Sequence, residues 1–186
     1  MHTLFDDQSL DMQDTCQTAQ DILGKILVVE TEQGVLAGRI LETEAYLEND
    51  PASHTYRGRT DRNTWMFYPA GTLYIYLIYG VHHCLNIVTG PEGTGEAVLI
   101  RALEPLEGIT VMQDNRQRLA VRDLCSGPGK LTQALGIDRS WSGEVLNQGR
   151  VSLESDGLHD FSIQQTPRIG ISQAKDLLYR YLFIPL

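Results

Sequence analysis

The sequence predicts a single α+β domain, residues 1–186, around a largely antiparallel β-sheet. The chain of 186 residues is long enough for one sizeable core, and its 42% hydrophobic and 21% charged content is ordinary for a globular protein. One helical pattern is followed by several strand patterns, and helices then mix with strands towards the C-terminus. No internal repeat or domain linker interrupts this order.

The first third of the chain predicts one helix and two strands. Residues 1–13 are polar and acidic, and the sequence leaves open whether they form a loose N-terminal segment. Residues 15–26 carry apolar positions near helical spacing, with Thr15 as a candidate cap, and predict a helix. Two strand patterns follow on either side of a turn at Gln33-Gly34. They cover residues 26–31 (ILVVET) and 35–47 (VLAGRILETEAYL).

A β-hairpin is the clearest feature of the middle of the chain. Residues 72–80 (TLYIYLIYG) and 82–88 (HHCLNIV) are strand patterns that meet at a turn. Alternation sends Tyr74 and Tyr76 to one face of the first strand and places Tyr79 near the turn. Tyrosines in strands usually just pack, and the alternative is that these rings stack on a flat group such as a nucleobase.

Two connections flank this hairpin. Residues 48–71 are rich in Asn, Asp, Pro, Ser, Arg and Gly, and so long a connection in a compact domain is usually functional or disordered. After the glycine-rich stretch 89–97, residues 98–105 (VLIRALEP) predict another strand. The C-terminal third predicts helices at 109–121 and 130–136, separated by the breaker run SGPG, and further strands.

Charge is unevenly distributed along the chain. The net charge of −9 resides in residues 1–50, whereas residues 51–186 hold thirteen acids and thirteen bases. Twelve of the fifteen cations are arginine, which binds phosphate through a flat bidentate fork. Arg57, Arg59 and Arg62 gather around Asp61, so the acidic total does not exclude a nucleic-acid partner. A solvated loop is the simpler interpretation of that segment taken alone.

The sequence carries no signal for export or membrane insertion. Its N-terminus is acidic, unlike a signal peptide, and no apolar run is long enough to span a bilayer. Cys16, Cys84 and Cys125 are odd in number and far apart, as expected of reduced thiols. We therefore expect a cytoplasmic protein of the bacterial type with no membrane partner. No zinc-ligand spacing or nucleotide-phosphate motif is present in the sequence, so we expect no metal and no cofactor.

The strand pattern at 35–47 carries the main candidate for chemistry. Alternation places Glu42, Glu44 and Tyr46 on one face, and Thr43 and Ala45 on the other. Two carboxylates about 6–7 Å apart beside an aromatic ring recur in hydrolysis through a cation-like transition state. The competing interpretation is that this face belongs to an edge strand and lies in water.

Three further side chains accompany that strand. His54 lies in the loop that supplies the arginine cluster, and Asn86 lies on the return strand of the hairpin, where a buried carboxamide needs hydrogen-bond partners or a ligand. Arg101 interrupts an apolar strand and needs a carboxylate partner, for which Glu44 is a candidate. A solvated histidine, a structural amide and a structural ion pair would explain the same residues.

The run SGPGK offers a candidate phosphate contact. Gly127, Pro128 and Gly129 precede a predicted helix, so their backbone could face a phosphate with Lys130 nearby. An ordinary helix start explains the same residues.

Together these strings resemble one family. The stretches ETEAY, PASHTYRGR, RN, MF, GTLYIYLIYG, CLNIV, LIRALEP, CSGPGKL and RIGI follow one another between about residues 15 and 183. In this order they are similar to the alkyladenine (3-methyladenine) DNA glycosylases of base-excision repair. The resemblance implies a single mixed domain with a curved antiparallel sheet, from which a hairpin protrudes into the minor groove of DNA.

The resemblance also implies an activity. The expected enzyme flips alkylated or deaminated purines (3-methyladenine, 7-methylguanine, hypoxanthine, ethenoadenine) out of double-stranded DNA and hydrolyses the N-glycosidic bond, leaving an abasic site. We expect it to be monofunctional, because Lys25, Lys130, Lys175 and the N-terminus are the only amines that could form a Schiff base for lyase chemistry. We expect a monomer that associates with the nucleoid when it is bound to DNA.

The same resemblance implies a role for each candidate residue. Glu44 matches the acid that activates the attacking water, and Arg101 matches the arginine that helps to hold that water. Tyr46 and Tyr76 match the rings that sandwich the flipped base. His54 matches a residue beside the base, Ile171 matches a backbone contact to the base, and Asn86 matches the residue at the base edge that disfavours guanine. Tyr79 matches the wedge in the duplex, and Arg59 and Arg62 match residues that contact phosphates.

Two positions depart from the family pattern. Asp61 stands where relatives often have proline, which weakens the local positive field, and His82-His83 replace more apolar or aromatic neighbours of the wedge. Two other classes of function stay open at this stage. The first is a catalytically silent protein that binds damaged DNA, and the second is a hydrolase of free nucleosides or small glycosides.

Overall fold

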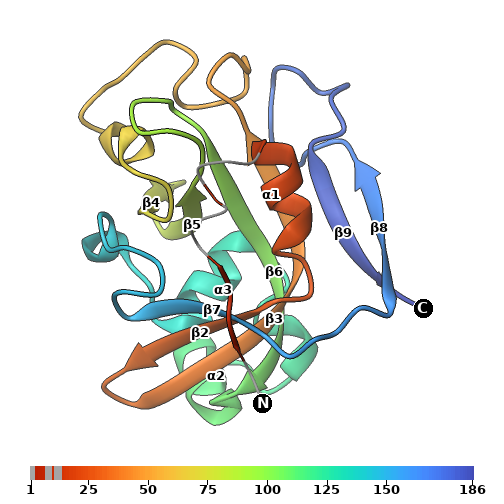
Figure 1. The fold of residues 1–186 in the computed structure, drawn as a ribbon. Coiled ribbons are helices and arrows are strands. Elements are labelled where there is room, and N and C mark those ends of the chain that lie inside the picture. Colours follow the sequence, from red (N-terminus) through yellow and green to blue (C-terminus); the bar gives the residue numbers. More distant parts are fainter. Residues whose placement is uncertain (1–2, 7–9, 11–13) are drawn as a thin grey trace.

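The computed structural model describes residues 3–6, 10 and 14–186, and it confirms the predicted α+β class (Figure 1). The described residues form three α-helices and an open, antiparallel nine-stranded sheet. The strands are β1 (Thr3–Leu4), β2 (Ile26–Thr31), β3 (Gly34–Tyr46), β4 (Leu73–Ile78), β5 (His82–Val88), β6 (Ala97–Glu107), β7 (Val151–Ser155), β8 (Phe161–Thr166) and β9 (Arg180–Pro185). Their order is β1-β7-β2-β3-β6-β5-β4, and off this path β9 pairs with β3 and β8 pairs with β9.

The long strand β3 holds the sheet together. Its first half pairs with β2, Glu42–Glu44 pair with β9 along the same edge, and β6 follows the opposite edge. Register shifts at Ala37/Gly38 and around Glu42 mark β-bulges, which bend a strand and increase its twist. The predicted acids therefore lie in the middle of the sheet, and the alternative of a solvated edge strand is wrong.

The helices pack on the sheet and close one hydrophobic core. Helix α1 (Thr15–Asp21) contacts β3 and β6, whereas α3 (Pro128–Leu135) contacts β5 and β6 and also packs against α2 (Ile109–Arg116) (Figure 1). Leu27, Ile40 and Leu85 are completely buried in this core. Burial of a single leucine or isoleucine contributes about 1.5–3 kcal/mol, so the core supplies most of the force that holds β3 in place.

Two predicted details of the first helix were wrong. The cap is Asp14, whose carboxylate accepts hydrogen bonds from the backbone N–H groups of Cys16 and Gln17, whereas Thr15 is buried and bonds to Thr89. The helix ends at Asp21 rather than at residue 26. Gly24 has a φ of +76° and donates its N–H to the carbonyl of Ile40, so the chain turns here into β2.

The second and third helices also begin or end at other residues than predicted. Helix α2 stops at Arg116 rather than at residue 121, because Gln117 takes the left-handed conformation at a φ of 50° and closes the last turn. Helix α3 begins two residues earlier than expected, with Pro128 in its first turn, and Gly136 ends it at a φ of 69°.

The described part of the N-terminal segment is attached to the sheet. Thr3 and Leu4 pair with Ser155 and Glu154 of β7, and Leu10 is completely buried. Residues 1–2, 7–9 and 11–13 of the segment for which a loose arrangement was left open lie outside the described residues. None of the helices that the structure describes is long and apolar enough to cross a membrane. Cys16, Cys84 and Cys125 are free cysteines.

The hairpin of β4 and β5 ends in an exposed tip. Tyr79 is 82% exposed and has a φ of 53°, and the next residue, Gly80, has a φ of 72°. Two successive positive φ angles match the primed turns that join tightly twisted strands. A bulky ring is unfavourable in this conformation, and such backbone strain often marks a functional position.

The long connection between β3 and β4 is folded against the sheet. The hydroxyl of Thr55 donates to the carbonyl of Gly95 at 2.6 Å, and the Asn63 amide donates to the carbonyls of His54 and Gly58 at 2.8 and 3.0 Å. A short 3₁₀ helix, Thr64–Phe67, precedes β4. These bonds hold His54 in one place although it lies in a loop.

The contact between Gly95 and Thr55 generates a stability prediction. A Cβ at Gly95 would lie 2.5 Å from Thr55 Cγ2, and a β-branched side chain cannot easily yield. We expect Gly95→Ala to lower the free energy of unfolding by about 1–3 kcal/mol, measured by urea denaturation. The control is Gly127→Ala, whose Cβ would lie 3.8 Å from its nearest neighbour, the flexible Lys130 side chain. This variant should change stability by at most about 0.5 kcal/mol. Equal midpoints for both variants would contradict the packing argument.

Candidate active site

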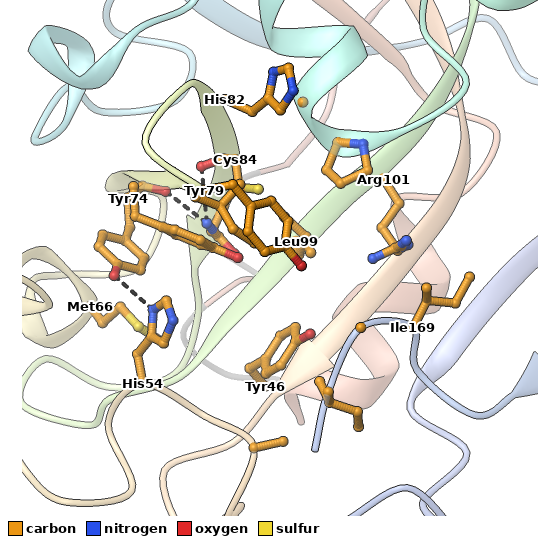
Figure 2. Close-up of a pocket in the computed structure, with 18 of the residues that line it drawn as sticks. Tyr46, His54, Met66, Tyr74, Tyr79, His82, Cys84, Leu99, Arg101 and Ile169 are labelled. Carbon is orange, nitrogen blue, oxygen red and sulfur yellow. Dashed lines mark hydrogen bonds between the residues drawn. The ribbon is translucent and has the colours of Figure 1, made fainter. Parts of the chain in front are cut away.

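A cavity of about 440 Å³ opens beside the hairpin, a size typical of ligand sites (Figure 2). Figure 2 shows Tyr74 and His54 on one side of it and Arg101 and Ile169 on the other. Its walls come from β3, β4, β5, β6, the long connection and the segment that follows β8. The predicted site residues that line it are Tyr46, His54, Arg62, Tyr76, Tyr79, Asn86, Arg101 and Ile171.

Aromatic rings form two separate walls of the cavity. On one wall, His54 packs edge-on against Tyr76 with ring centroids 4.6 Å apart, and Tyr76 lies 5.5 Å from Tyr74. The Tyr74 hydroxyl and His54 Nδ1 share a hydrogen bond of 2.9 Å, so Tyr74 supports the histidine from behind (Figure 2). Tyr46 lines the same cavity from β3 and has no ring contact with this group among the described aromatic residues. The space between the two walls suits a flat ligand.

Glu44 lies directly behind this cavity. Its side chain is completely buried, and three residues of the cavity wall contact its carboxylate. The Tyr46 hydroxyl donates to Oε2 at 2.8 Å, the Ile169 N–H donates to Oε1 at 2.8 Å, and Arg101 Nη1 lies 3.2 Å from Oε2. The alternation rule thus correctly placed Glu44 and Tyr46 on one face.

Burial and these contacts act on Glu44 in opposite directions. Burial raises the pKa of Glu44 above its ordinary value, because the charged form loses water. The Arg101 guanidinium, the Ile169 amide and the Tyr46 hydroxyl each favour the carboxylate and limit that rise in pKa. Glu44 is therefore a buried carboxyl group whose pKa is raised by burial and held back by three specific partners, and such opposed influences are typical of catalytic groups.

The predicted pairing of Arg101 with Glu44 is confirmed, and Arg101 also binds a second carboxylate, that of Glu42. Arg101 Nε donates to Glu42 Oε1 at 2.7 Å while its Nη1 faces Glu44. The same Glu42 oxygen accepts a bond of 2.5 Å from Arg180 Nε on β9. Two arginines and two glutamates thus neutralise one another across three strands. Nothing in the sequence indicated that Arg180 takes part.

Asn86 has a fixed orientation in the cavity wall. Its Nδ2 donates to the carbonyls of Tyr74 and Cys84 at 2.9 and 3.3 Å, and the residue is 4% exposed. Both predicted explanations hold in part, because the amide is structurally bonded and also lines the cavity. The side chain cannot turn without breaking these bonds, so it is a rigid part of the wall.

Two predicted phosphate-binding residues lie outside the cavity lining. Arg59 donates to the Thr64 hydroxyl at 2.9 and 2.7 Å and lies 5.8 Å from the ring centroids of Phe67 and Tyr68. Lys130 Nζ bonds to the Ser126 hydroxyl at 2.9 Å and is otherwise exposed. Both side chains are on the surface, where they can meet a polyanion, and Arg62 lies at the cavity rim.

The two positions that depart from the family pattern have different surroundings. Asp61 is exposed beside Arg62 in the long connection. His82 lines the cavity and packs against α3, since a Cβ on Gly129 would lie only 2.8 Å from His82 Cβ. His82 therefore braces the hairpin on the helix.

Several cavity residues were missed by sequence reasoning. Cys84 precedes Asn86 by two residues on β5, so period-two alternation could have found it. Leu99 pairs with both Glu44 and Asn86 across the sheet, a register that no local pattern reveals. Met66 lies in the short 3₁₀ helix Thr64–Phe67, and Ile169 lies in a loop within the string RIGI, where only Ile171 was singled out.

Metal ligands do not cluster here. Within residues 3–6, 10 and 14–186, no group of three or more His, Cys, Asp or Glu side chains could hold a metal ion. The chemistry that the described side chains can supply is that of a carboxylate next to a guanidinium, behind an aromatic slot. Such a pair can orient and deprotonate a water molecule and stabilise positive charge on a substrate.

Comparison with known proteins supplies an independent line of evidence. Residues 9–184 match the family model described as "Methylpurine-DNA glycosylase (MPG)". Proteins named "Putative 3-methyladenine DNA glycosylase" from Francisella tularensis subsp. tularensis (strain SCHU S4 / Schu 4) and Carboxydothermus hydrogenoformans are 50% and 48% identical, over 90% of this chain and 89% of each relative. One with that name from Methanoculleus marisnigri is 51% identical over the same shares.

The histidine of the aromatic wall generates a pH prediction. Burial of the ring edge against its neighbours lowers the pKa of His54 below the ordinary value, and the Arg62 guanidinium lowers it further. We expect the His54 ring protons in an NMR titration to show a pKa below 6.5. Since the folded-state pKa is depressed, the stability that neutral His54 contributes is full above the unfolded pKa and is lost as the pH falls through the folded one.

A pair of arginine variants tests the cause. Arg62→Gln should raise the pKa of His54, because it removes the guanidinium charge, one of the two causes of the low pKa. Arg59→Gln serves as the control and should leave that pKa unchanged, because Arg59 is bonded to Thr64 and does not act on His54. A His54 titration at or above the ordinary pKa in the unmodified protein would contradict the geometry.

Proposed function

The chain belongs to the methylpurine-DNA glycosylase family, and from that premise we propose that it is a monofunctional DNA glycosylase of base-excision repair. In this proposal it acts as a monomer on double-stranded DNA and releases alkylated or deaminated purines, leaving an abasic site. Its substrates would be 3-methyladenine, 7-methylguanine, hypoxanthine and ethenoadenine. The observation that carries the proposal is the buried Glu44–Arg101 pair behind a cavity with two aromatic walls.

The cavity would take the damaged base after rotation out of the duplex. Tyr46 would stack on one face of the base and Tyr76 on the other, with His54 beside them. Stacking on two rings offsets part of the few kcal/mol that unpairing and unstacking cost. A damaged base pairs more weakly than a normal one, so its extrusion costs less and the selection of lesions begins at this step.

Hydrolysis would then use the carboxylate of Glu44. In its ionised form Glu44 takes a proton from a water molecule, whose oxygen forms a bond to C1′ of the deoxyribose while the N-glycosidic bond breaks. The bonding electrons leave with the base, and the sugar passes through an oxocarbenium-like state that the nearby carboxylate stabilises. Arg101 would help to hold this water, since its guanidinium lies 3.2 Å from Glu44 and also lines the cavity.

The leaving group decides how much help the enzyme must supply. A 3-methylated adenine is already cationic and departs readily, whereas hypoxanthine is neutral and needs a proton as it leaves. Normal guanine would be disfavoured by the fixed amide of Asn86, because its 2-amino group would meet that rigid wall. The backbone at Ile171 would contact the edge of the base from the opposite side of the cavity.

The exposed tip of the hairpin would fill the gap in the duplex. Tyr79 is 82% exposed, lines the cavity rim and has a strained backbone, all of which suit a ring that inserts between base pairs. Arg59, Arg62 and Lys130 would neutralise phosphates on this side of the protein. The positive charge of these residues would let an acidic protein approach DNA.

The distribution of lysines supports hydrolysis without lyase activity. Lys25, Lys130 and Lys175 do not line the cavity, and Lys25 Nζ lies 3.4 Å from the hydroxyl oxygen of Ser155 at the end of β7. A lyase would need an amine within reach of C1′ to form a Schiff base. The N-terminal amine lies outside the described residues.

The first test removes the carboxylate. Glu44→Gln keeps the shape of the side chain but removes the carboxylate that would accept a proton from water. It should lower single-turnover release of hypoxanthine and of methylated purines by about 10²-fold or more. Binding of the lesion duplex should persist. The control is Glu104→Gln on the exposed part of β6, which should act like the unmodified protein.

The outcome separates the enzyme from the alternative functions. Abasic sites would be revealed by alkaline cleavage, and the strand should stay whole before alkali if no lyase acts. A duplex that is bound but never depurinated by the unmodified protein would make it a silent binder of damaged DNA. Equal release from free nucleosides would make it a nucleoside hydrolase.

The second test removes the wedge. Tyr79→Ala should lower the rate on a lesion in duplex DNA by about tenfold, because the ring that offsets lost stacking is gone, and single-stranded DNA should be affected much less. Tyr56→Ala is the matched control, since Tyr56 is another exposed tyrosine, at 53%, and does not line the cavity. Equal losses on both substrates would exclude the wedge role of Tyr79.

A further inference from the structure

A second buried ion pair lies behind the cavity and has no part in the mechanism above. Arg168 and Asp50 have side chains that are 0% and 2% exposed. Arg168 binds both carboxylate oxygens of Asp50, one of them at 3.0 Å, and Nη1 also donates to the carbonyl of Ala45 at 2.9 Å. Asp50 lies near the start of the long connection and Arg168 just after β8, so the pair joins segments that are distant in the sequence.

The guanidinium of Arg168 also supports the aromatic wall. Its central carbon lies 4.7 Å from the ring centroid of Tyr46, within the range of a cation–π contact, and 5.3 Å from that of Tyr179. Arg168 does not line the cavity, whereas Tyr46 does, so the arginine contacts the ring from the interior of the protein. The ring is therefore fixed from behind.

The residue next to Arg168 contacts the proposed catalytic base. The Ile169 N–H donates to Glu44 Oε1 at 2.8 Å, and residues 169–172 form part of the cavity lining. Ile169 is itself 50% exposed and packs little, so the anchor of this amide is the neighbouring arginine. One side chain thus determines where the Tyr46 ring, the β3 backbone at Ala45 and the Ile169 amide lie.

We propose that Arg168, locked by Asp50, is a positioning residue that aligns the Tyr46 wall and the Ile169 amide with the Glu44 carboxylate. This inference rests on the proposed function for its kinetic readout only. A buried ion pair is seldom needed for stability alone, because neutral groups of similar volume often serve as well. Arg168 Nε has no hydrogen-bond partner among the described residues, so the fold does not even satisfy the arginine completely.

Loss of the pair should act on the ionisation of Glu44. The groups that face Glu44 are the Ile169 amide and the charged or titratable side chains of five residues, Arg101, Tyr46, Glu42, Cys84 and Arg168. Of these, the Ile169 amide and the Arg168 charge would be lost together. The hydrogen bond from the Ile169 amide favours the carboxylate, so its loss raises the pKa of Glu44 and shifts the acidic limb of the pH–rate profile to higher pH. The opposite charges of Arg168 and Asp50 are lost as a neutral pair.

The test uses a double variant, because a single substitution would leave one buried charge unpaired. Asp50→Asn with Arg168→Gln replaces the pair by neutral amides that can still bond to each other. We expect single-turnover base release at neutral pH to fall about tenfold, the acidic limb to move to higher pH, and duplex affinity to stay within about twofold. Arg168→Lys keeps the positive charge but loses the bidentate guanidinium, and its rate of base release should lie between those of the double variant and the unmodified protein.

The matched control is another Arg–Asp pair of the same chain. Arg39 Nη2 lies 2.7 Å from Asp156 Oδ2, and neither residue lines the cavity. Arg39→Gln with Asp156→Asn removes the same charges and should leave the rate and the acidic limb unchanged. Thermal unfolding of all variants shows whether they are folded. If the double variant is unfolded, the rate and the Glu44 pKa of Arg168→Lys test the positioning role instead.

A readout without activity separates this inference from the proposed function. The Glu44 carboxyl carbon can be titrated by ¹³C NMR in the free protein, with Glu44→Gln to identify its signal. Absence of base release by the unmodified protein would reject the glycosylase, but a raised Glu44 pKa in the double variant would still support the positioning role. An unchanged Glu44 pKa in folded variants, or a loss of rate without a shift of the acidic limb, would overturn it.

Discussion

The burial of Glu44 in the central strand is the constraint on which the rest of this site depends. A carboxylate without water is unfavourable unless charged or polar groups compensate it. Here Arg101 from β6, the Ile169 amide from the C-terminal loop and the Tyr46 hydroxyl supply that compensation. The sheet must therefore bring β6 next to β3, and the chain after β8 must return to β3, before these groups can compensate the buried acid.

The same strand that buries the acid also exposes its aromatic neighbour. Glu44 and Tyr46 are two residues apart and share a face, but the carboxylate is turned inwards and the ring borders the cavity. The opposite wall comes from the hairpin, where Tyr76 and His54 are supported by the buried Tyr74. The buried acid and one cavity wall thus come from β3, and the opposite wall and the exposed tip come from the hairpin of β4 and β5 and the connection before it.

Local rules predicted much of this arrangement, and their failures have physical causes. Alternation correctly paired Glu44 with Tyr46, and charge compensation correctly gave Arg101 a carboxylate partner. Helix ends were predicted less accurately, because Gln117 ends α2 in the left-handed conformation and the chain turns at Gly24 after α1, and neither residue stands out by helix propensity. The edge-strand alternative failed because the partners of β3 are β6 and β9, which are far away in the sequence.

The sequence by itself determined the class of fold, the elements and the identity of the residues that could do chemistry, since these depend on periodicity, composition and ordered motifs. Tertiary structure decided which of these residues meet. Glu42 is shared by Arg101 and Arg180, and Arg168 joins Asp50 behind Tyr46, although neither pair has a local signal. Such contacts depend on sheet register and on how loops return to the core, and both are set by the packing of the whole chain rather than by neighbouring residues.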